Sequence, residues 1–256
     1  ILVIGNDHKG HGLTAEKDED LGYFGEEKSA AVIEDLHEVT RYAKEQYGAD
    51  VPYFLFGHSM GSFMARRYLM TYGEELTGAI ICGTGYTPGA VLTAGKLCAG
   101  VISKVKGERH RSKFLQKLAF GNYLARVETP ETPHDWISRD RDVVRRYAAD
   151  PKCTFTFTNS AMGELTRTLR QVSGQDWADR LRKAMPVLLL AGDADPVGSY
   201  GKGVRQVYAM LQKAGLTDLT LTLYPGGRHE MLNEINRDQV YADVLAWCDR
   251  SLERMA

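Results

Sequence analysis

The stretch PYFLFGHSMGSFMARRYL, residues 52–69, joins an apolar run to a helical pattern through two glycines that bracket one serine. Tyr53 to Phe56 is short, apolar and aromatic, which predicts a buried strand. Phe63 to Leu69 favours a helix that ends near Gly73. Glycines suit such a tight turn because they let strand and helix backbones approach without Cβ clashes. The turn would display the Ser59 hydroxyl at a sheet end, over a helix N-terminus.

An ordinary glycine turn is the alternative interpretation of this G-x-S-x-G motif. The chain has 26 glycines, and at this content the motif arises by chance in about one such sequence in ten. The apolar run before the motif and the helical pattern after it favour the display of a nucleophile.

Short apolar runs and helical patterns alternate over much of the chain, which predicts an α/β fold with a mostly parallel sheet flanked by helices. The first run opens the chain and reads as an interior strand, so we expect earlier strands of the sheet to precede this sequence. The predicted strands lie within 1–5, 53–56, 78–85, 185–196 and 219–230, and the clearest helical patterns cover 32–47, 202–214 and 239–255.

The segment 87–184 differs from the rest because it has helical patterns but little strand character. We therefore predict an α/β core of residues 1–86 and 185–256 and a helical cap, or lid, of residues 87–184. Some apolar side chains of the cap should pack within it, and others should line an apolar channel. The residues considered for these roles are Leu92, Leu97, Val101, Ile102, Phe114, Leu115 and Leu118.

Charge and cysteine content exclude several functions. The net charge of -1 creates no field that would recruit nucleic acid. The cysteines, Cys82, Cys98, Cys153 and Cys248, show no metal-binding or disulfide-framework spacing, which favours reduced thiols and a cytoplasmic location. A targeting signal would sit ahead of Ile1. No pattern fixes an oligomeric state.

The cap carries a basic run, which favours a solvated helical face. The alternative is a transient contact with a membrane or micelle surface through phospholipid headgroups. The basic residues are Lys96, Lys104, Lys106, Arg109, Arg111, Lys113 and Lys117.

Three predicted strand ends carry the groups that activate a serine. A serine nucleophile needs a base, and the base needs a third group that holds its tautomer. Ser59 follows one strand, Asp193 and Asp195 follow another, and His229 follows a third. The order Ser, Asp, His is that of α/β-hydrolases. Spacing alone does not separate Asp193 from Asp195, and the alternative role for Asp193 is to stabilise its turn.

The segments GHSMG, AGDADPVGSYGKGV and YPGGRHEMLNE resemble the monoacylglycerol lipase and lysophospholipase branch of the α/β-hydrolases. NDHKGHG is similar to the D-x-R-G-H-G loop of that branch, with Lys9 in place of Arg. The resemblance implies that Ser59 is the nucleophile, Asp195 the acid and His229 the base. It also implies that the Met60 N–H is one oxyanion donor. The second donor is expected on an H-G loop before Ile1.

Other polar residues near these motifs receive structural interpretations. His58 is expected to point away from the site, and Glu230 to be a helix-terminal charge. His8 and His11 lie near Asp7 but favour a locally hydrogen-bonded loop over a metal site. The sequence GKG at 201–203 lacks the spacing of a phosphate loop. We expect no metal, nucleotide or other cofactor.

The leading hypothesis is a serine hydrolase that cleaves single-chain lipid esters, such as a monoacylglycerol or a lysophospholipid, through an acyl-enzyme on Ser59. The alternatives on the same fold are a peptidase, a thioesterase or a small-ester hydrolase. A binding protein with negligible turnover is the alternative from another class, and the presence of all three triad candidates argues against it.

Overall fold

The computed structural model describes residues 1–25 and 28–254, which divide into two compact units. Unit 1 comprises Ile1–Val51, Pro88–Gly121 and Asp150–Gln171. Unit 2 comprises Pro52–Thr87, Asn122–Ala149 and Val172–Ala256. The boundaries of these two units differ from those of the predicted core, residues 1–86 and 185–256, and of the predicted cap, residues 87–184. The division into core and cap stays a prediction.

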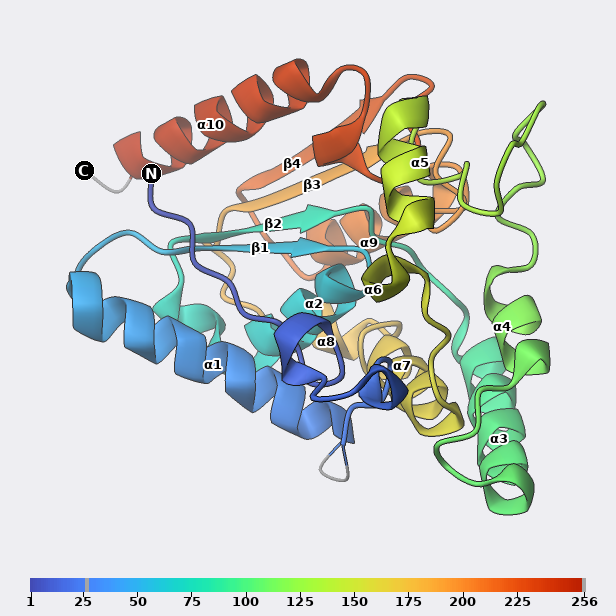
Figure 1. Ribbon diagram of the computed structural model, residues 1–256. Coiled ribbons are helices and arrows are strands. Elements are labelled where there is room, and N and C mark those ends of the chain that lie inside the picture. The colour runs from blue at the N-terminus through green and yellow to red at the C-terminus, as the bar shows by residue number, and fades with distance from the viewer. Residues whose placement is uncertain (26–27, 255–256) are drawn as a thin grey trace. The chain divides into compact units, whose positions relative to one another are not determined.

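Unit 2 is built on a parallel sheet with the strand order β1-β2-β3-β4 (Figure 1). The strands are β1 (Phe54–His58), β2 (Gly78–Cys82), β3 (Val187–Gly192) and β4 (Leu219–Tyr224). Every described residue of β2 and β3 is buried, as expected for central parallel strands that read as continuous apolar runs. The predicted α/β fold class is confirmed.

One face of the sheet packs against the C-terminal helix α10 (Arg237–Glu253). Alternate strand residues point to the same face, so Ile80 of β2 and Leu188 of β3 join one cluster with Val240 and Trp247 of α10. Burial of a large apolar side chain contributes about 1.5–3 kcal/mol, so this cluster stabilises the packing of α10 on the sheet. Figure 1 shows α10 along one side of the sheet.

Helices α2 (Met60–Tyr72) and α9 (Lys202–Lys213) connect neighbouring parallel strands. Connections between parallel strands are right-handed. Because β1 to β2 and β3 to β4 both run in the same direction across the sheet, α2 and α9 lie on the same face of the sheet. Arg66 of α2 is 1% exposed, with its guanidinium 4.4 Å from the Trp177 ring centre. It donates to the Gly85 carbonyl and to that of Val172. Burial lowers the pKa of the Arg66 guanidinium to about 9. The two carbonyl acceptors hold α2 beside the end of β2.

The remaining helical elements of unit 2 are short. They are the 3-10 helices η3 (Gly73–Glu75) and η4 (Met231–Asn233) and the α-helices α5 (Arg141–Ala149) and α8 (Asp176–Asp179).

Unit 1 is helical. Its longer helices are α1 (Lys28–Tyr47), α3 (Gly89–Lys106), α4 (Lys113–Phe120) and α7 (Asn159–Gln171), with the short α6 (Pro151–Thr154), η1 (Gly12–Thr14) and η2 (Asp18–Asp20). Helix α3 packs against α7, and Ala99, Leu115 and Met162 form the buried centre of their cluster. Leu115 is therefore one of the apolar residues of the segment 87–184 that pack inside a helical cluster.

The described residues 87–184 contain α3 to α8 and no strand, as their sequence predicts. In the part of the chain that the structure describes, no helix has both the length and the apolar character needed to cross a lipid bilayer.

Two strand predictions are wrong in detail. Residues 1–5 form no strand, and Ile1 is 95% exposed. A strand needs hydrogen-bonding partners, and this run has none among the backbone pairs of the described residues. The predicted buried strand at 53–56 is instead the edge strand β1, where Phe56 is 37% exposed.

Candidate functional site

Ser59 occupies the turn between β1 and α2 with φ 54° and ψ -121°. A residue other than glycine with positive φ costs about 1–3 kcal/mol and marks a constrained position. A Cβ at Gly57 would lie 2.5 Å from the Gly61 oxygen and 2.7 Å from the Ala65 Cβ, so glycine is required there. A Cβ at Gly61 would have no described atom within 4 Å. Of the two glycines, only Gly57 therefore excludes a Cβ, and the backbone oxygen that this Cβ would strike belongs to Gly61.

Backbone contacts hold Ser59 at the end of β2. Its N–H donates to the Cys82 carbonyl over 3.0 Å, and its own carbonyl accepts from the Ser62 hydroxyl over 2.6 Å. Met60 is the first residue of α2. The first N–H groups of a helix lack intrahelical acceptors, so the Met60 N–H is placed where an oxyanion donor is predicted.

Asp195 and His229 meet in the buried part of unit 2. The His229 Nδ1 lies 2.9 Å from the Asp195 Oδ2, and the side chains are 3% and 0% exposed, respectively. The other carboxylate oxygen, Oδ1, accepts the Val197 N–H over 2.8 Å. An ionised carboxylate only accepts hydrogen bonds, so Nδ1 carries the proton and Nε2 is the basic nitrogen.

The electrostatics of the site favour a protonated His229 in spite of its burial. Burial lowers the pKa of His229. The charge of the Asp195 carboxylate and its hydrogen bond raise this pKa, the Glu230 charge raises it further, and together they outweigh the effect of burial. The pKa of His229 therefore lies above its ordinary value. A base held in this way accepts a proton readily and stabilises the imidazolium that forms.

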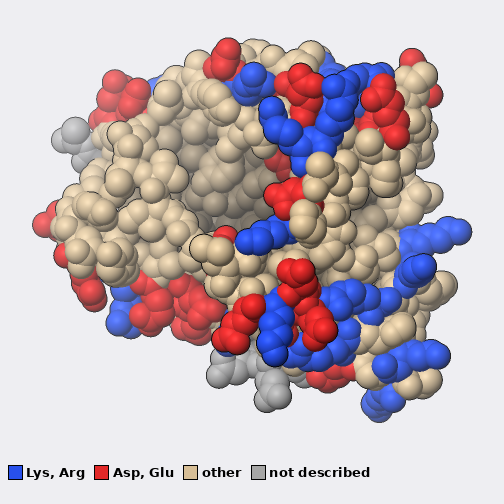
Figure 2. All heavy atoms as spheres, in the orientation of Figure 1, with Lys and Arg blue, Asp and Glu red and all other residues tan. Residues whose placement is uncertain are grey.

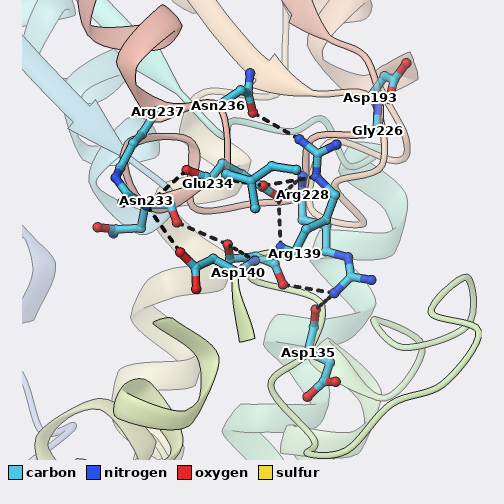
Figure 3. Close-up of polar contacts among 12 residues, drawn as sticks. Asp135, Arg139, Asp140, Asp193, Gly226, Arg228, Asn233, Glu234, Asn236 and Arg237 are labelled. Atoms are coloured by element: carbon cyan, nitrogen blue, oxygen red, sulfur yellow. Dashed lines mark hydrogen bonds and ion pairs between the residues drawn. The ribbon is translucent and has the colours of Figure 1, made fainter. Parts of the chain in front are cut away.

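Asp193 has a different partner. Its Oδ1 accepts the Gly226 N–H over 2.7 Å at the turn after β4 (Figure 3). The structure therefore separates the two acids, because Asp195 contacts the histidine and Asp193 stabilises the turn. The turn itself packs closely on β3, since a Cβ at Gly192 would lie 1.9 Å from the Gly227 oxygen.

A buried carboxylate, Glu234, organises the loop that carries His229. The side chain is fully buried. Its Oε1 accepts from the backbone N–H groups of Arg139 and Arg228, and its Oε2 accepts from the Arg139 Nε over 3.0 Å. Figure 3 shows Arg139 reaching Asn236 as well, over 3.0 Å. A buried charge is tolerated only when it is paired and hydrogen-bonded, and Glu234 satisfies this condition with groups from two distant segments.

Contacts of Arg228 and Glu230 bring residues 135–138, part of the predicted cap, close to His229. Arg228 donates to the carbonyls of Asp135 and Ser138, and the Glu230 N–H donates to the Ile137 carbonyl over 2.7 Å. As a result the Trp136 ring lies 5.0 Å from that of His229, and the Tyr123 ring lies 4.7 Å from Trp136.

His58 is not where the sequence led us to expect it. Its ring lies 4.6 Å from that of His229, and its Nε2 lies 3.4 Å from the Glu230 Oε1. The prediction that this side chain points away from the site is therefore wrong. The clue in the sequence was the position of His58 beside Ser59 and of Glu230 beside His229, two neighbouring pairs on loops that converge.

The histidines of the N-terminal loop lie in unit 1. His11 stacks on Phe24, with ring centres 5.8 Å apart, and its Nδ1 lies 3.1 Å from the Lys9 carbonyl. Among the described residues, no group of histidine, cysteine and carboxylate side chains has the arrangement of a metal site.

The comparisons with known proteins agree on one family. Residues 1–236 match the family described as serine aminopeptidase, S33. The monoacylglycerol lipase of Mycolicibacterium smegmatis is 28% identical over 251 residues, which cover 96% of this chain and 78% of the relative.

Solved structures are also similar to this chain over most of its length. A thermostable carboxyl esterase from Bacillus coagulans, solved with glycerol, is 34% identical with a TM-score of 0.87, and the match covers 95% of this chain and 78% of that chain. A monoglyceride lipase variant from Saccharomyces cerevisiae, 17% identical with a TM-score of 0.69, covers 96% of this chain and 76% of that chain. At this identity it shows the shared fold alone.

Proposed function

Because the chain belongs to the serine aminopeptidase S33 family of α/β-hydrolases, we propose that it is a serine hydrolase that cleaves single-chain lipid esters. The observation that carries the proposal is the buried Asp195–His229 pair, combined with Ser59 in its strained turn at the end of the same sheet. Relatives named monoacylglycerol lipase and monoglyceride lipase support a monoacylglycerol as the substrate. A lysophospholipid is the other single-chain ester that the proposal includes.

The proposed reaction passes through an acyl-enzyme. The Ser59 Oγ attacks the ester carbonyl while the His229 Nε2 accepts its proton, and Asp195 stabilises the resulting imidazolium. The Met60 N–H donates to the oxyanion, and His229 then returns the proton to the leaving alcohol. Water, deprotonated by the same Nε2, cleaves the acyl-enzyme and regenerates Ser59.

The preferred acyl chain tests the substrate class. We expect kcat/KM to rise strongly from acetyl to octanoyl and dodecanoyl glycerol esters, because each buried methylene contributes about 0.8 kcal/mol. A fluorophosphonate probe should label one peptide, the one that contains Ser59. A flat chain-length profile would remove the lipid-ester proposal and leave a general serine hydrolase.

A peptidase is the second candidate because the family description names an aminopeptidase. Aminoacyl amides and an acyl-CoA thioester assayed beside the esters would separate peptidase and thioesterase activity from the proposed one. Covalent labelling without turnover on any of these substrates would favour a binding protein.

We also propose that the cap touches the lipid surface transiently through an α3–α4 face. Arg109 and Arg111 of the basic run are engaged within unit 1, Arg109 with Asp20 and Arg111 with backbone carbonyls. The lysines of the run are exposed, and Figure 2 shows Lys and Arg side chains gathered over α3 and α4. Beside them lie exposed apolar residues that define the α3–α4 face: Val91, Leu97, Val101, Val105, Phe114 and Leu118.

Substitution on this face should affect only dispersed substrates. Phe114 and Leu118 are 59% and 62% exposed, so Phe114→Asp or Leu118→Asp should leave the fold intact. We expect about a tenfold loss of turnover on monoacylglycerol in anionic vesicles, through lost apolar burial and added negative charge. Hydrolysis of a soluble butyryl ester should not change. Leu245→Asp, at an exposed position of α10, is the matched control, and equal losses on both substrates would contradict the proposal.

A further inference from the structure

Two histidine rings lie side by side in unit 2, although the proposed reaction uses only one. His58 ends β1, His229 follows β4, and the ring planes are inclined by 44° with the centres 4.6 Å apart. An imidazolium that forms on His229 during catalysis therefore forms against the His58 ring. Charges on the groups that contact His58 therefore interact with the His229 imidazolium over a short distance.

The contacts of His58 indicate which nitrogen carries its proton. Its Nδ1 lies 3.3 Å from the Cys82 Sγ. Burial, together with the Glu230 and Asp195 charges, raises the pKa of Cys82 well above its ordinary value, so the group stays a thiol. A thiol beside Nδ1 can donate to it, which leaves the proton on Nε2. That nitrogen faces the Glu230 Oε1 at 3.4 Å.

Glu230 is fixed from several directions. Its Oε2 accepts from the Asn233 Nδ2 over 2.9 Å, and its backbone N–H is held by the Ile137 carbonyl. Burial raises the pKa of Glu230, but His58, His229 and Asn233 together lower it to about 2. Glu230 is therefore a carboxylate throughout the pH range in which an ester hydrolase works.

We propose that Glu230 is a positioning residue that places a second negative charge beside His229, with its carboxylate hydrogen-bonded by Asn233 and facing the His58 Nε2 at 3.4 Å. The proposal rests on the proposed function, because it assigns the charge to the base of that reaction. Asp195 binds the Nδ1 proton directly and fixes the ring, whereas Glu230 acts through space from the side of His58. Its effect is greatest when His229 is protonated, which is the state of the base in the transition state.

The other groups around His229 do not supply this charge. Cys82, at the end of β2, is a thiol. Burial, with the Asp195 charge, raises the pKa of Tyr123, so its phenol is neutral. The Arg228 guanidinium donates to the Asp135 and Ser138 carbonyls. Among the described residues, the charges that raise the pKa of His229 are those of Asp195 and Glu230.

The test is the pKa of His229 in a Glu230→Gln variant. The amide keeps the size of the side chain and its hydrogen-bonding capacity but removes the negative charge. Loss of a nearby negative charge disfavours the imidazolium, so we expect the pKa of His229 to fall by about half a pH unit or more. The acid limb of the kcat/KM profile should move to lower pH by the same amount, and the plateau kcat should fall about threefold to tenfold.

The pKa is measured by NMR titration of ¹³C-labelled histidine, with the His229 signal assigned by its loss in His229→Asn. Asp238→Asn is the control, because it removes one charge from an exposed position at the start of α10 and should leave both the titration and the turnover unchanged. An unmoved pKa in Glu230→Gln overturns the proposal, even if turnover falls. The titration does not depend on ester hydrolysis, so it can be read whether or not the proposed function holds.

Discussion

Replacing Ser59 by alanine is expected to reduce kcat for ester hydrolysis by about 10⁶-fold, the loss that follows removal of the nucleophile in a comparable triad. The expectation follows from the proposed acyl-enzyme, because no acyl group can be transferred to a methyl side chain. Labelling by a fluorophosphonate should disappear in parallel. The measurements are burst and steady-state kinetics with a nitrophenyl ester, and mass spectrometry of the labelled protein.

The variant should fold normally because the turn is held by backbone groups. The Ser59 N–H donates to Cys82, and its carbonyl accepts from Ser62, and alanine keeps both contacts. Ser199→Ala is the matched control, since Ser199 is an exposed serine that also has a positive φ, and its loss should leave labelling unchanged. Turnover like that of the wild type in Ser59→Ala, with an unchanged melting temperature, would refute the serine-hydrolase proposal.

Local sequence patterns predict the elements whose partners follow from their own composition. The continuous apolar run at 187–192 forms a strand buried along its whole length, β3. Val204, Val207 and Leu211 recur at helical spacing and are buried along one face of α9. In both cases the residues that form the element also bury it, so a short window of sequence is sufficient.

Other features depend on partners that a short window does not contain. Ile1 to Gly5 has the composition of a strand, but composition supplies no hydrogen-bonding neighbour. Glu234 is buried because Arg139 approaches it from 95 positions away in the chain. A single sequence gives no signal for such a pair, because an isolated glutamate reads as a surface residue.

The sequence predicts some residues of the candidate site and misses the contacts of others. The motif around Ser59 carries its own structural context, so the strained turn follows from adjacent residues. Asp193 and Asp195 share one loop, and only their three-dimensional partners separate them. His58 and Glu230 were interpreted from their immediate neighbours alone, so their contact across two loops was missed.

Asp195→Asn should cost far more activity than Asp193→Asn, by about 10⁴-fold in kcat for the first, as in a related triad, and less than about threefold for the second. The amide oxygen at position 195 would accept the Val197 N–H that now reaches Oδ1, which turns the amide NH₂ toward His229. Nδ1 would then have to accept, so the proton would move to Nε2 and the base could not take the Ser59 proton.

At position 193 the amide oxygen can still accept the Gly226 N–H, so the turn survives and the charge lost is that of an exposed side chain. Both variants keep the size of the side chain, and their melting temperatures serve to exclude misfolding. The decisive measurement is kcat for a soluble ester across pH 6 to 9, because the tautomer argument predicts a loss for Asp195→Asn at every pH where the wild type is active. If Asp193→Asn showed the larger loss instead, the acid of the triad would be Asp193, and the buried contact between Asp195 and His229 would have a structural role.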